Sequence, residues 1–154
     1  MTIAYLALGS NLNTPHRQLY LAIKSLARLP HTFLLRQASL LSNQAYGRKQ
    51  QPRFINTVVK INTSLTAWQL LRQCQHIEKK FGRTRRVRWG ARTLDIDILI
   101  FDSIKSTHPK LLLPHPELSK RDFVLLPLSE IAPQLIISNG LSVQQLAEHF
   151  LTKD

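Results

Sequence analysis

The sequence predicts an α+β fold, in which a ferredoxin-like βαββαβ antiparallel sheet has helices on one face and is followed by a C-terminal elaboration. Four segments have the composition or alternation of strands, and two segments with helical periodicity separate the first strand from the second and the third from the fourth. This order is typical of two split βαβ units that share one sheet. With 154 residues, 44% of them hydrophobic, we expect a single domain over residues 1–154.

The first unit is expected to begin with a short apolar strand over 2–8. Pro15 suits the first turn of the helix that follows, and Pro30 ends it. One face of this helix carries the apolar side chains Leu19, Ala22, Ile23 and Leu26. A second strand is expected over 32–41, and a polar connection over 42–53 follows it.

The second unit begins with a β-branched strand over 54–62. Thr66 and Gln69 are spaced as a capping box at the start of the next helix. The apolar stripe of that helix is Leu70, Cys74, Ile77 and Phe81. The basic segment 83–92 is expected to be a mobile loop. The final strand is expected over 93–101, with its even positions sharing one face: Leu94, Ile96, Ile98 and Ile100.

The remaining residues are expected to elaborate this sheet. A short apolar segment over 111–113 comes first, and a helix over about 123–131 follows. The last helix is expected over about 142–151, because Ser142 and Gln145 have the spacing of another capping box.

The charge of the chain narrows the classes of partner. Lys and Arg number 21 against 9 Asp and Glu, which gives a formal net charge of +12. Such a protein attracts nucleic acid, anionic membrane surfaces or phosphorylated small molecules. Residues 1–77 contain no acidic side chain. Asp95 and Asp97 follow seven basic ones: Lys79, Lys80, Arg83, Arg85, Arg86, Arg88 and Arg92.

The acidic pair is the main candidate for chemistry. The period of a strand puts Asp95 and Asp97 on one face, about 6–7 Å apart, opposite the apolar positions. Two carboxylates on one rigid strand suit Mg²⁺, and an Arg-rich loop beside them suits phosphoryl transfer. We therefore expect nucleotide chemistry here. The alternative is a polar strand face that neighbouring arginines neutralise.

Other side chains fit a flat ligand. Phe54 and Asn56 lie two apart on one strand and so face one way, an arrangement that suits a heteroaromatic ring, although such a Phe also suits a core. Trp89 lies within the basic segment, where it can stack on a base, close over a site or make a simple packing contact. Gln75 and Glu78 are neighbours on the second helix, either at a ligand or on a solvated face.

The sequence disfavours several classes of protein and of binding site. The single cysteine excludes an intramolecular disulfide framework and a Cys-rich zinc site. Residues 9–11 lack the end of a phosphate-binding P-loop. No apolar run reaches the roughly 18 residues of a membrane helix, and residues 1–10 do not read as a signal peptide, so we expect a cytoplasmic protein without a membrane partner.

An RNA-recognition module has the same order of elements and is the rival interpretation. Such a module needs a glycine and further aromatic residues on its third strand, whereas residues 53–59 read RFINTVV. Carboxylates on the open sheet face would also repel a nucleic-acid backbone. We therefore expect no nucleic-acid partner.

The string RWGARTLDID at 88–97 resembles the signature of the 6-hydroxymethyl-7,8-dihydropterin pyrophosphokinase family of folate biosynthesis. The similarity extends over about 2–135. It includes the segments 7–12, 51–56, 77–78, 82–83, 113–116, 121–125 and 131–133. The resemblance implies that pyrophosphate passes from ATP, the co-substrate, to the hydroxymethyl group of the reduced pterin, giving the pterin diphosphate and AMP. It also implies two Mg²⁺ ions, held by Asp95 and Asp97, in an enzyme that we expect to be a monomer.

The resemblance further implies roles for individual residues. Arg83 and Arg92 would meet the phosphates during transfer as the catalytic pair. The pterin-binding positions would be Asn43, Tyr46, Phe54, Asn56 and Phe123. The nucleotide-binding positions would be Gln75, Glu78, Trp89, Ile98, Lys110, His115 and Arg121.

Two departures leave a further alternative. Residues 42–47 replace a Tyr-x-Thr-x-Pro-type stretch that helps to hold the pterin in the family, and Leu112 stands where relatives have a hydroxyl residue. The chain is then either the pyrophosphokinase or a paralogue with an altered or weakened pterin site.

Overall fold

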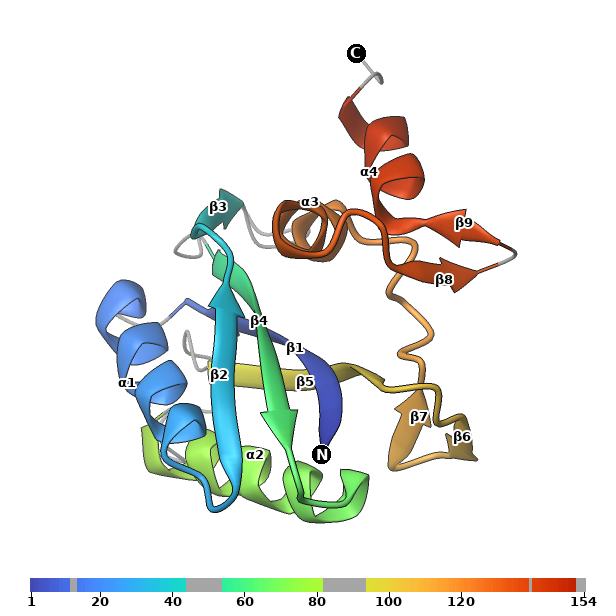
Figure 1. Ribbon diagram of the computed structural model, residues 1–154. Coiled ribbons are helices and arrows are strands. Elements are labelled where there is room, and N and C mark those ends of the chain that lie inside the picture. The colour runs from blue at the N-terminus through green and yellow to red at the C-terminus, as the bar shows by residue number, and fades with distance from the viewer. Residues whose placement is uncertain (12–13, 44–53, 82–93, 139, 152–154) are drawn as a thin grey trace.

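The computed structural model describes residues 1–11, 14–43, 54–81, 94–138 and 140–151. Its centre is a five-stranded sheet, and every pairing within it is antiparallel (Figure 1). The strands are β1 (Thr2–Ser10), β2 (Thr32–Gln37), β3 (Leu41–Asn43), β4 (Phe54–Thr63) and β5 (Leu94–Phe101). Their order is β2-β4-β1-β5, and β3 pairs with β4 beyond the end of β2.

Two helices cover one face of the sheet and close the first core. Helix α1 (Pro15–Ala27) joins β1 to β2, and α2 (Ala67–Phe81) joins β4 to β5. Their buried stripes pack on the inward side chains of the strands, Leu6, Leu8 and Ile61 among them. The capping box that begins α2 is confirmed, since the Gln69 N–H donates to Thr66 Oγ1 at 3.1 Å and the Thr66 N–H donates to Gln69 Oε1 at 2.8 Å.

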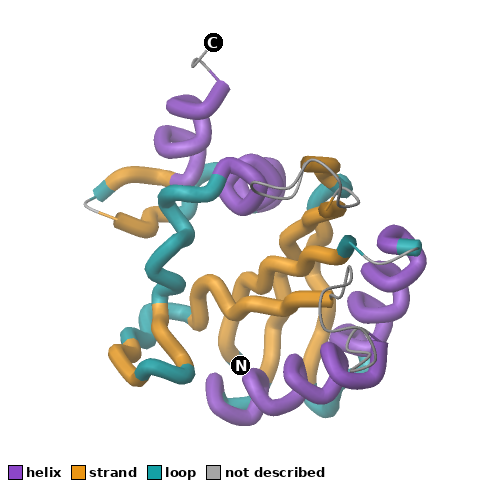
Figure 2. The backbone as a smooth tube through the Cα atoms, turned by 180° about the vertical axis from the view of Figure 1, so that it is seen from behind, coloured by secondary structure: helices purple, strands orange, loops and turns teal. Residues whose placement is uncertain are grey.

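The other face of the sheet carries a second core, which the sequence did not predict. Helix α3 (Asp122–Ile131) lies across this face and packs against α4 (Val143–Leu151), as Figure 2 shows from behind. The second core joins side chains of the sheet to those of both helices: Tyr5, Val58 and Leu99 with Leu125, Leu128, Val143 and Ala147. Thus the α+β class and the antiparallel sheet are confirmed, but helices cover both faces.

Two small hairpins complete the C-terminal elaboration. They are β6 (Ser106–His108) with β7 (Leu111–Leu113), and β8 (Ile136–Ser138) with β9 (Leu141–Ser142). The capping box predicted for the last helix is present, since the Gln145 N–H donates to Ser142 Oγ and the Ser142 N–H donates to Gln145 Oε1. None of the helices in the described ranges has both the length and the apolar character needed to cross a bilayer.

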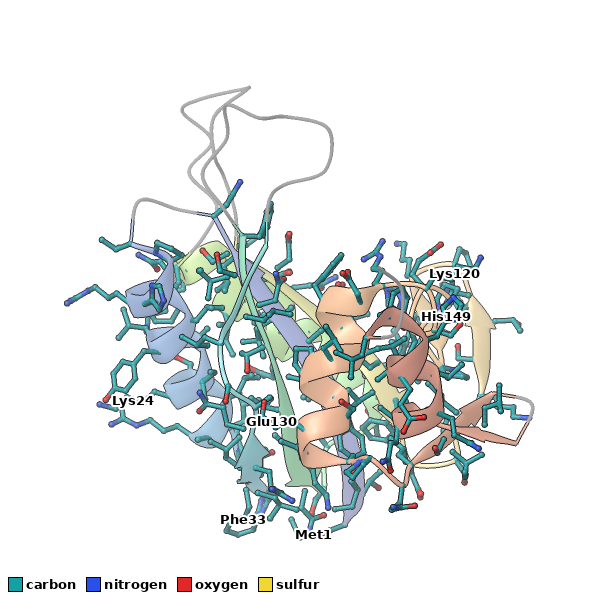
Figure 3. The ribbon with its side chains drawn as sticks, turned by 90° about the horizontal axis from the view of Figure 1, so that it is seen from above. Met1, Lys24, Phe33, Lys120, Glu130 and His149 are labelled. Atoms are coloured by element: carbon teal, nitrogen blue, oxygen red, sulfur yellow. The ribbon has the colours of Figure 1, made fainter. Side chains whose placement is uncertain are left out.

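The predicted strand over 32–41 is wrong in one respect, because it is interrupted between β2 and β3. There the Ala38 N–H donates to the Val58 carbonyl, and Ser39 donates from its N–H and its hydroxyl to the carboxylate of Glu130 on α3. In Figure 3, Glu130 lies on the side of α3 that faces this corner. The strand therefore restarts at Leu41, the last residue of the predicted strand, and β3 continues for two residues into the segment predicted as a connection.

The shared face predicted for β5 is also wrong at Ile100. The register of β5 against β1 pairs Ile98 with Leu6 but Ile100 with Tyr5, so Leu99 is the additional residue of a β-bulge. Leu99 and Ile100 consequently belong to the second core. The predicted loop over 83–92 lies outside the described residues.

Candidate active site

The candidate site is built on a row of facing residues in neighbouring strands. Gly9 on β1 is paired with Asn56 on β4 and with Asp95 on β5. Ala7, two residues earlier on β1, is paired with Asp97. Because alternate residues of a strand share a face, Ala7 and Gly9 form a floor of small residues between Asn56 and the two carboxylates.

Gly9 permits a close approach of the Asn56 side chain to β1. A Cβ atom added there would lie 2.7 Å from Asn56 Oδ1, a separation that real Cβ atoms do not show. The absence of a side chain thus allows the buried Asn56 amide to lie over the backbone of β1.

A cavity of about 560 Å³ lies over this floor, between the sheet and α3. It is lined by Ala7, Leu8, Gly9, Phe54, Asn56, Thr57, Asp95, Asp97, Glu117, Lys120, Arg121, Phe123 and Val124. Phe54 comes from β4 and Phe123 from the first turn of α3, so two aromatic rings line the cavity from opposing elements. Six of these lining residues were predicted as site residues from the sequence: Phe54, Asn56, Asp95, Asp97, Arg121 and Phe123.

Charges of both signs meet in this cavity. Asp95 is half-buried and Asp97 is exposed on β5, and Lys120 and Arg121 come from the segment that leads into α3. The Arg121 guanidinium lies 5.7 Å from the centre of the Phe123 ring, a cation–π contact. The cavity therefore combines acidic oxygens from β5 and Glu117 with the cations of Lys120 and Arg121.

A second cavity of about 180 Å³ opens beside the first. Asp97 lines both cavities, so they meet at this residue. Ile98, Lys110 and His115, which the sequence placed at a nucleotide, all line the second one. His115 is held in place because its N–H donates to the Leu99 carbonyl at 2.8 Å and its Nδ1 accepts the Glu117 N–H at 3.1 Å.

Gln75 and Glu78 lie apart from these two cavities, in a small groove on α2. Glu78 has a structural contact that the sequence did not reveal. Its Oε2 accepts the N–H of Ile96 at 2.8 Å, on the edge strand and between the two aspartates. A carboxylate of α2 therefore helps to fix the backbone on which Asp95 and Asp97 are carried.

Cys74 lies buried in the first core, one turn of α2 before Glu78. Burial raises the pKa of its thiol, and the negative charges of Glu78 and Asp97 raise it further. The thiol is therefore held in its neutral form.

Some predicted positions cannot be placed. Tyr46, Arg83, Trp89 and Arg92 lie outside the described residues. The backbone of Asn43 pairs with that of Phe54 at the end of β3, next to the first cavity. Gly9 is a lining residue that the sequence did not identify, because the strand was predicted over 2–8 and so ended before it, whereas β1 extends to Ser10.

Comparison with known proteins identifies relatives over nearly the whole chain. A family model described as 7,8-dihydro-6-hydroxymethylpterin-pyrophosphokinase (HPPK) matches residues 5–133. The 2-amino-4-hydroxy-6-hydroxymethyldihydropteridine pyrophosphokinase of Haemophilus influenzae is 41% identical over 150 residues, which are 97% of this chain and 94% of the relative. The Pseudomonas aeruginosa protein of the same name is 42% identical over 142 residues, covering 92% and 88% of the two chains.

The fold has solved counterparts. The crystal structure of wild-type Plasmodium falciparum HPPK-DHPS with SDX-DHP matches 99% of this chain with a TM-score of 0.70 and 16% identity. This chain spans 44% of that longer one, and the likeness concerns the fold alone. The family model and the bacterial relatives confirm the resemblance seen in the sequence, and the chain belongs to the 7,8-dihydro-6-hydroxymethylpterin-pyrophosphokinase family.

Proposed function

We propose that the chain transfers pyrophosphate from ATP to the hydroxymethyl group of 6-hydroxymethyl-7,8-dihydropterin, releasing AMP and the pterin diphosphate used in folate biosynthesis. Family membership supports this activity. One observation supports the place of the reaction in the structure. Asp97 lines two adjoining cavities, of which one is flanked by aromatic rings and the other is lined by Lys110 and His115. Two substrates can thus approach each other at one carboxylate.

The larger cavity is proposed to take the pterin. Phe54 and Phe123 would stack on its two faces, since a flat ring suits the space between elements that each present an aromatic side chain. Asn56 offers an amide that can both donate to and accept from the pterin edge. Gly9 supports this arrangement because it leaves room for that amide. Asn43 and Tyr46 remain proposed pterin contacts, and the sequence resemblance is the basis for both.

Asp95 and Asp97 are the proposed Mg²⁺ ligands. Their carboxylate oxygens are the donors that Mg²⁺ prefers, and this ion is commonly held by one or two carboxylates together with substrate phosphates. When bound, Mg²⁺ neutralises charge on the phosphate oxygens. The number of ions, two by resemblance, is part of the proposal. Glu78, through Ile96, would keep the two carboxylates at a fixed spacing.

The smaller cavity is proposed to take the nucleotide. Its apolar wall includes Ile98, and Lys110 and His115 bring polar groups to it. Arg121 would reach phosphate from the rim of the larger cavity. Arg83, Arg92, Trp89 and Gln75 are proposed contacts from the sequence, with the two arginines countering charge that develops on the transferred group.

The remaining predictions from the sequence, on fold description, oligomeric state, location and partners, are part of this proposal. The strand order supports a ferredoxin-like description, because β1-α1-β2 and β4-α2-β5 each enclose one antiparallel strand. A monomeric, cytoplasmic enzyme without a nucleic-acid partner is proposed on the composition and on the sheet face being used for small ligands.

The test is to incubate the purified chain with MgATP and the reduced pterin alcohol, and to follow AMP and pterin diphosphate by chromatography. Asp95→Asn and Asp97→Asn keep the shape of the side chain and remove its charge. Each is expected to lower turnover by about 10²–10³-fold, the size typical of losing one group that stabilises transition-state charge. Asp102→Asn is the matched control, an exposed aspartate just beyond β5 that is expected to leave turnover unchanged.

Turnover near the wild-type rate in both site variants would contradict the metal role. Pterin or ATP binding by the wild-type chain without AMP release would identify the altered paralogue instead. Tight, salt-sensitive binding of single-stranded RNA that both substitutions leave unaffected would favour the RNA-binding alternative.

A further inference from the structure

The turn between β6 and β7 departs from the usual chemistry of a tight hairpin. His108 is paired with Leu111, which leaves Pro109 and Lys110 as a two-residue loop. Such loops favour primed turns, whose first central residue has a positive φ. Proline cannot adopt that φ, and neither loop residue is among the described residues with positive φ. The twist of this turn therefore does not match the twist of its strands, and other contacts must hold it.

The side chain of His108 supplies two such contacts. Its Nδ1 accepts the backbone N–H of Lys110 at 3.1 Å. Its ring meets the Trp68 ring edge to face, with the centroids 4.8 Å apart and the planes at 89°. One contact closes the turn, and the other attaches it to the body of the protein.

Trp68 is itself in a fixed place. It lies in the first turn of α2, within the Thr66–Gln69 capping box, and its side chain is 47% exposed. A continuous series of contacts therefore runs from α2 through Trp68 and His108 to the backbone of Lys110. The ends of this series are 42 residues apart in the sequence, so no local pattern reveals it.

The turn carries a cation at the second cavity. Pro109 and Lys110 line that cavity together with Asp97 and His115. A lysine ammonium on a four-carbon stem loses much rotamer freedom when it binds an anion, and a loose backbone beneath it would add to that cost. Fixing the backbone of Lys110 is thus a means of increasing what its charge contributes to binding.

We propose that His108 is a positioning residue for nucleotide binding. It holds the Pro109–Lys110 turn through its Nδ1 and holds the hairpin against α2 through its ring on Trp68, so that the Lys110 ammonium meets the phosphates of the nucleotide. This inference rests on the proposed function, which places the nucleotide in the second cavity.

Three substitutions separate the two contacts. His108→Ala removes both, His108→Phe keeps a ring for Trp68, and His108→Asn keeps an acceptor, because an Asn side chain readily accepts the N–H two residues ahead. Calorimetry with Mg²⁺ and a non-hydrolysable ATP analogue gives the affinity, and steady-state assays give KM and kcat. His108→Ala is expected to weaken nucleotide binding and raise KM for ATP by about three- to tenfold, with kcat unchanged.

The partial variants and a control sharpen this expectation. His108→Asn is expected to restore most of the affinity and His108→Phe only part of it. His16→Ala, at an exposed histidine on α1, serves as the matched control and is expected to change nothing. Thermal unfolding of each variant checks that the fold is retained. A fall in kcat with KM unchanged, or equal losses in the Ala and Asn variants, would overturn the positioning role.

Lys110→Ala completes a double-mutant cycle. If His108 acts through Lys110, His108→Ala has no further effect on nucleotide affinity once Lys110 is alanine. If Lys110→Ala weakens binding but His108→Ala has the same effect in both backgrounds, or none in the wild type, the positioning role is overturned and the cavity assignment stands. If Lys110→Ala leaves the affinity unchanged, the nucleotide assignment of this cavity fails, and the positioning role fails with it.

Discussion

At Gly9, the absence of a side chain decides where Asn56 can lie. Gly9→Ala puts a methyl group where only 2.7 Å separates it from Asn56 Oδ1, so the amide must move. We expect the affinity for the pterin alcohol to fall about tenfold, which corresponds to one misplaced hydrogen-bonding group. Calorimetry with the pterin alcohol measures this, and the affinity for MgATP is expected to stay the same.

A cycle with Asn56→Ala tests the cause of that loss. If the methyl group acts through the amide, Gly9→Ala has little further effect on pterin binding when Asn56 is alanine. A full tenfold loss in both backgrounds would instead show that the methyl group obstructs the pterin itself.

The buried thiol of Cys74 predicts a dependence of stability on pH. Burial raises its pKa in the folded chain, whereas the unfolded thiol titrates near 8.5. As the pH rises above about 8.5, the unfolded chain releases a proton that the native chain keeps, so the free energy of unfolding falls. Urea titrations from about pH 7.5 to 10 are expected to show a steeper fall for the wild type than for Cys74→Ala, by up to about 1.4 kcal/mol per pH unit. Parallel curves would contradict the raised pKa.

Single residues were predictable where a local period determines their direction. Asp95 and Asp97, like Phe54 and Asn56, are two apart on a strand, and the structure brings all four to one cavity. The contact of Glu78 with Ile96 was not predictable in this way. It depends on how α2 lies along the edge of the sheet, which no local spacing records.

Among the elements, α3 is attached to the β2–β3 corner by Glu130. Its carboxylate accepts the Ser39 hydroxyl at 2.8 Å and the Ser39 N–H at 3.1 Å. Because both groups are exposed to water, Glu130→Ala is expected to lower the free energy of unfolding by only about 1 kcal/mol. Urea denaturation measures it. Ser39→Ala should remove the hydroxyl part of the contact. The double variant should therefore lose less free energy of unfolding than the sum of the two single losses. Strictly additive losses would show that the contact contributes nothing to stability.

Helix starts were predictable, and breaks in strands were not. The two capping boxes are signals that lie within four residues, and both form as the sequence indicates. At the interruption after β2, Ser39 contacts Glu130, 91 residues away, and the bulge at Leu99 is defined by the register with β1. Such features arise from long-range packing rather than from local preference.

At the scale of the whole molecule, the net charge of +12 predicts a salt effect that distinguishes the two substrates. MgATP is anionic and the pterin alcohol is neutral. Raising the ionic strength from about 0.01 M to about 0.15 M shortens the screening length from about 30 Å to about 8 Å. The Kd for MgATP is therefore expected to rise several-fold, while the Kd for the pterin alcohol stays constant. Equal shifts for both ligands would show that the net charge has no part in nucleotide binding.

The packing of two cores on opposite faces of one sheet could not be predicted from the sequence. The apolar stripes of α1 and α2 predicted the first core, which Leu19 and Leu70 help to fill. The helix over 123–131 was predicted as an element, but nothing local indicated that Leu125 and Leu128 would pack on the opposite face. That packing is what puts Phe123 over the floor formed by Ala7 and Gly9.

The first cavity thus draws its floor from the earliest residues of the chain and its roof from residues more than a hundred positions later. During synthesis, the ribosome delivers β1 long before α3. A growing chain that ends at β5 has both aspartates but nothing above them. If the pterin binds in this cavity as proposed, it can stabilise only a polypeptide that has been extended through α3, and a product truncated before Phe123 gains no protection from the substrate.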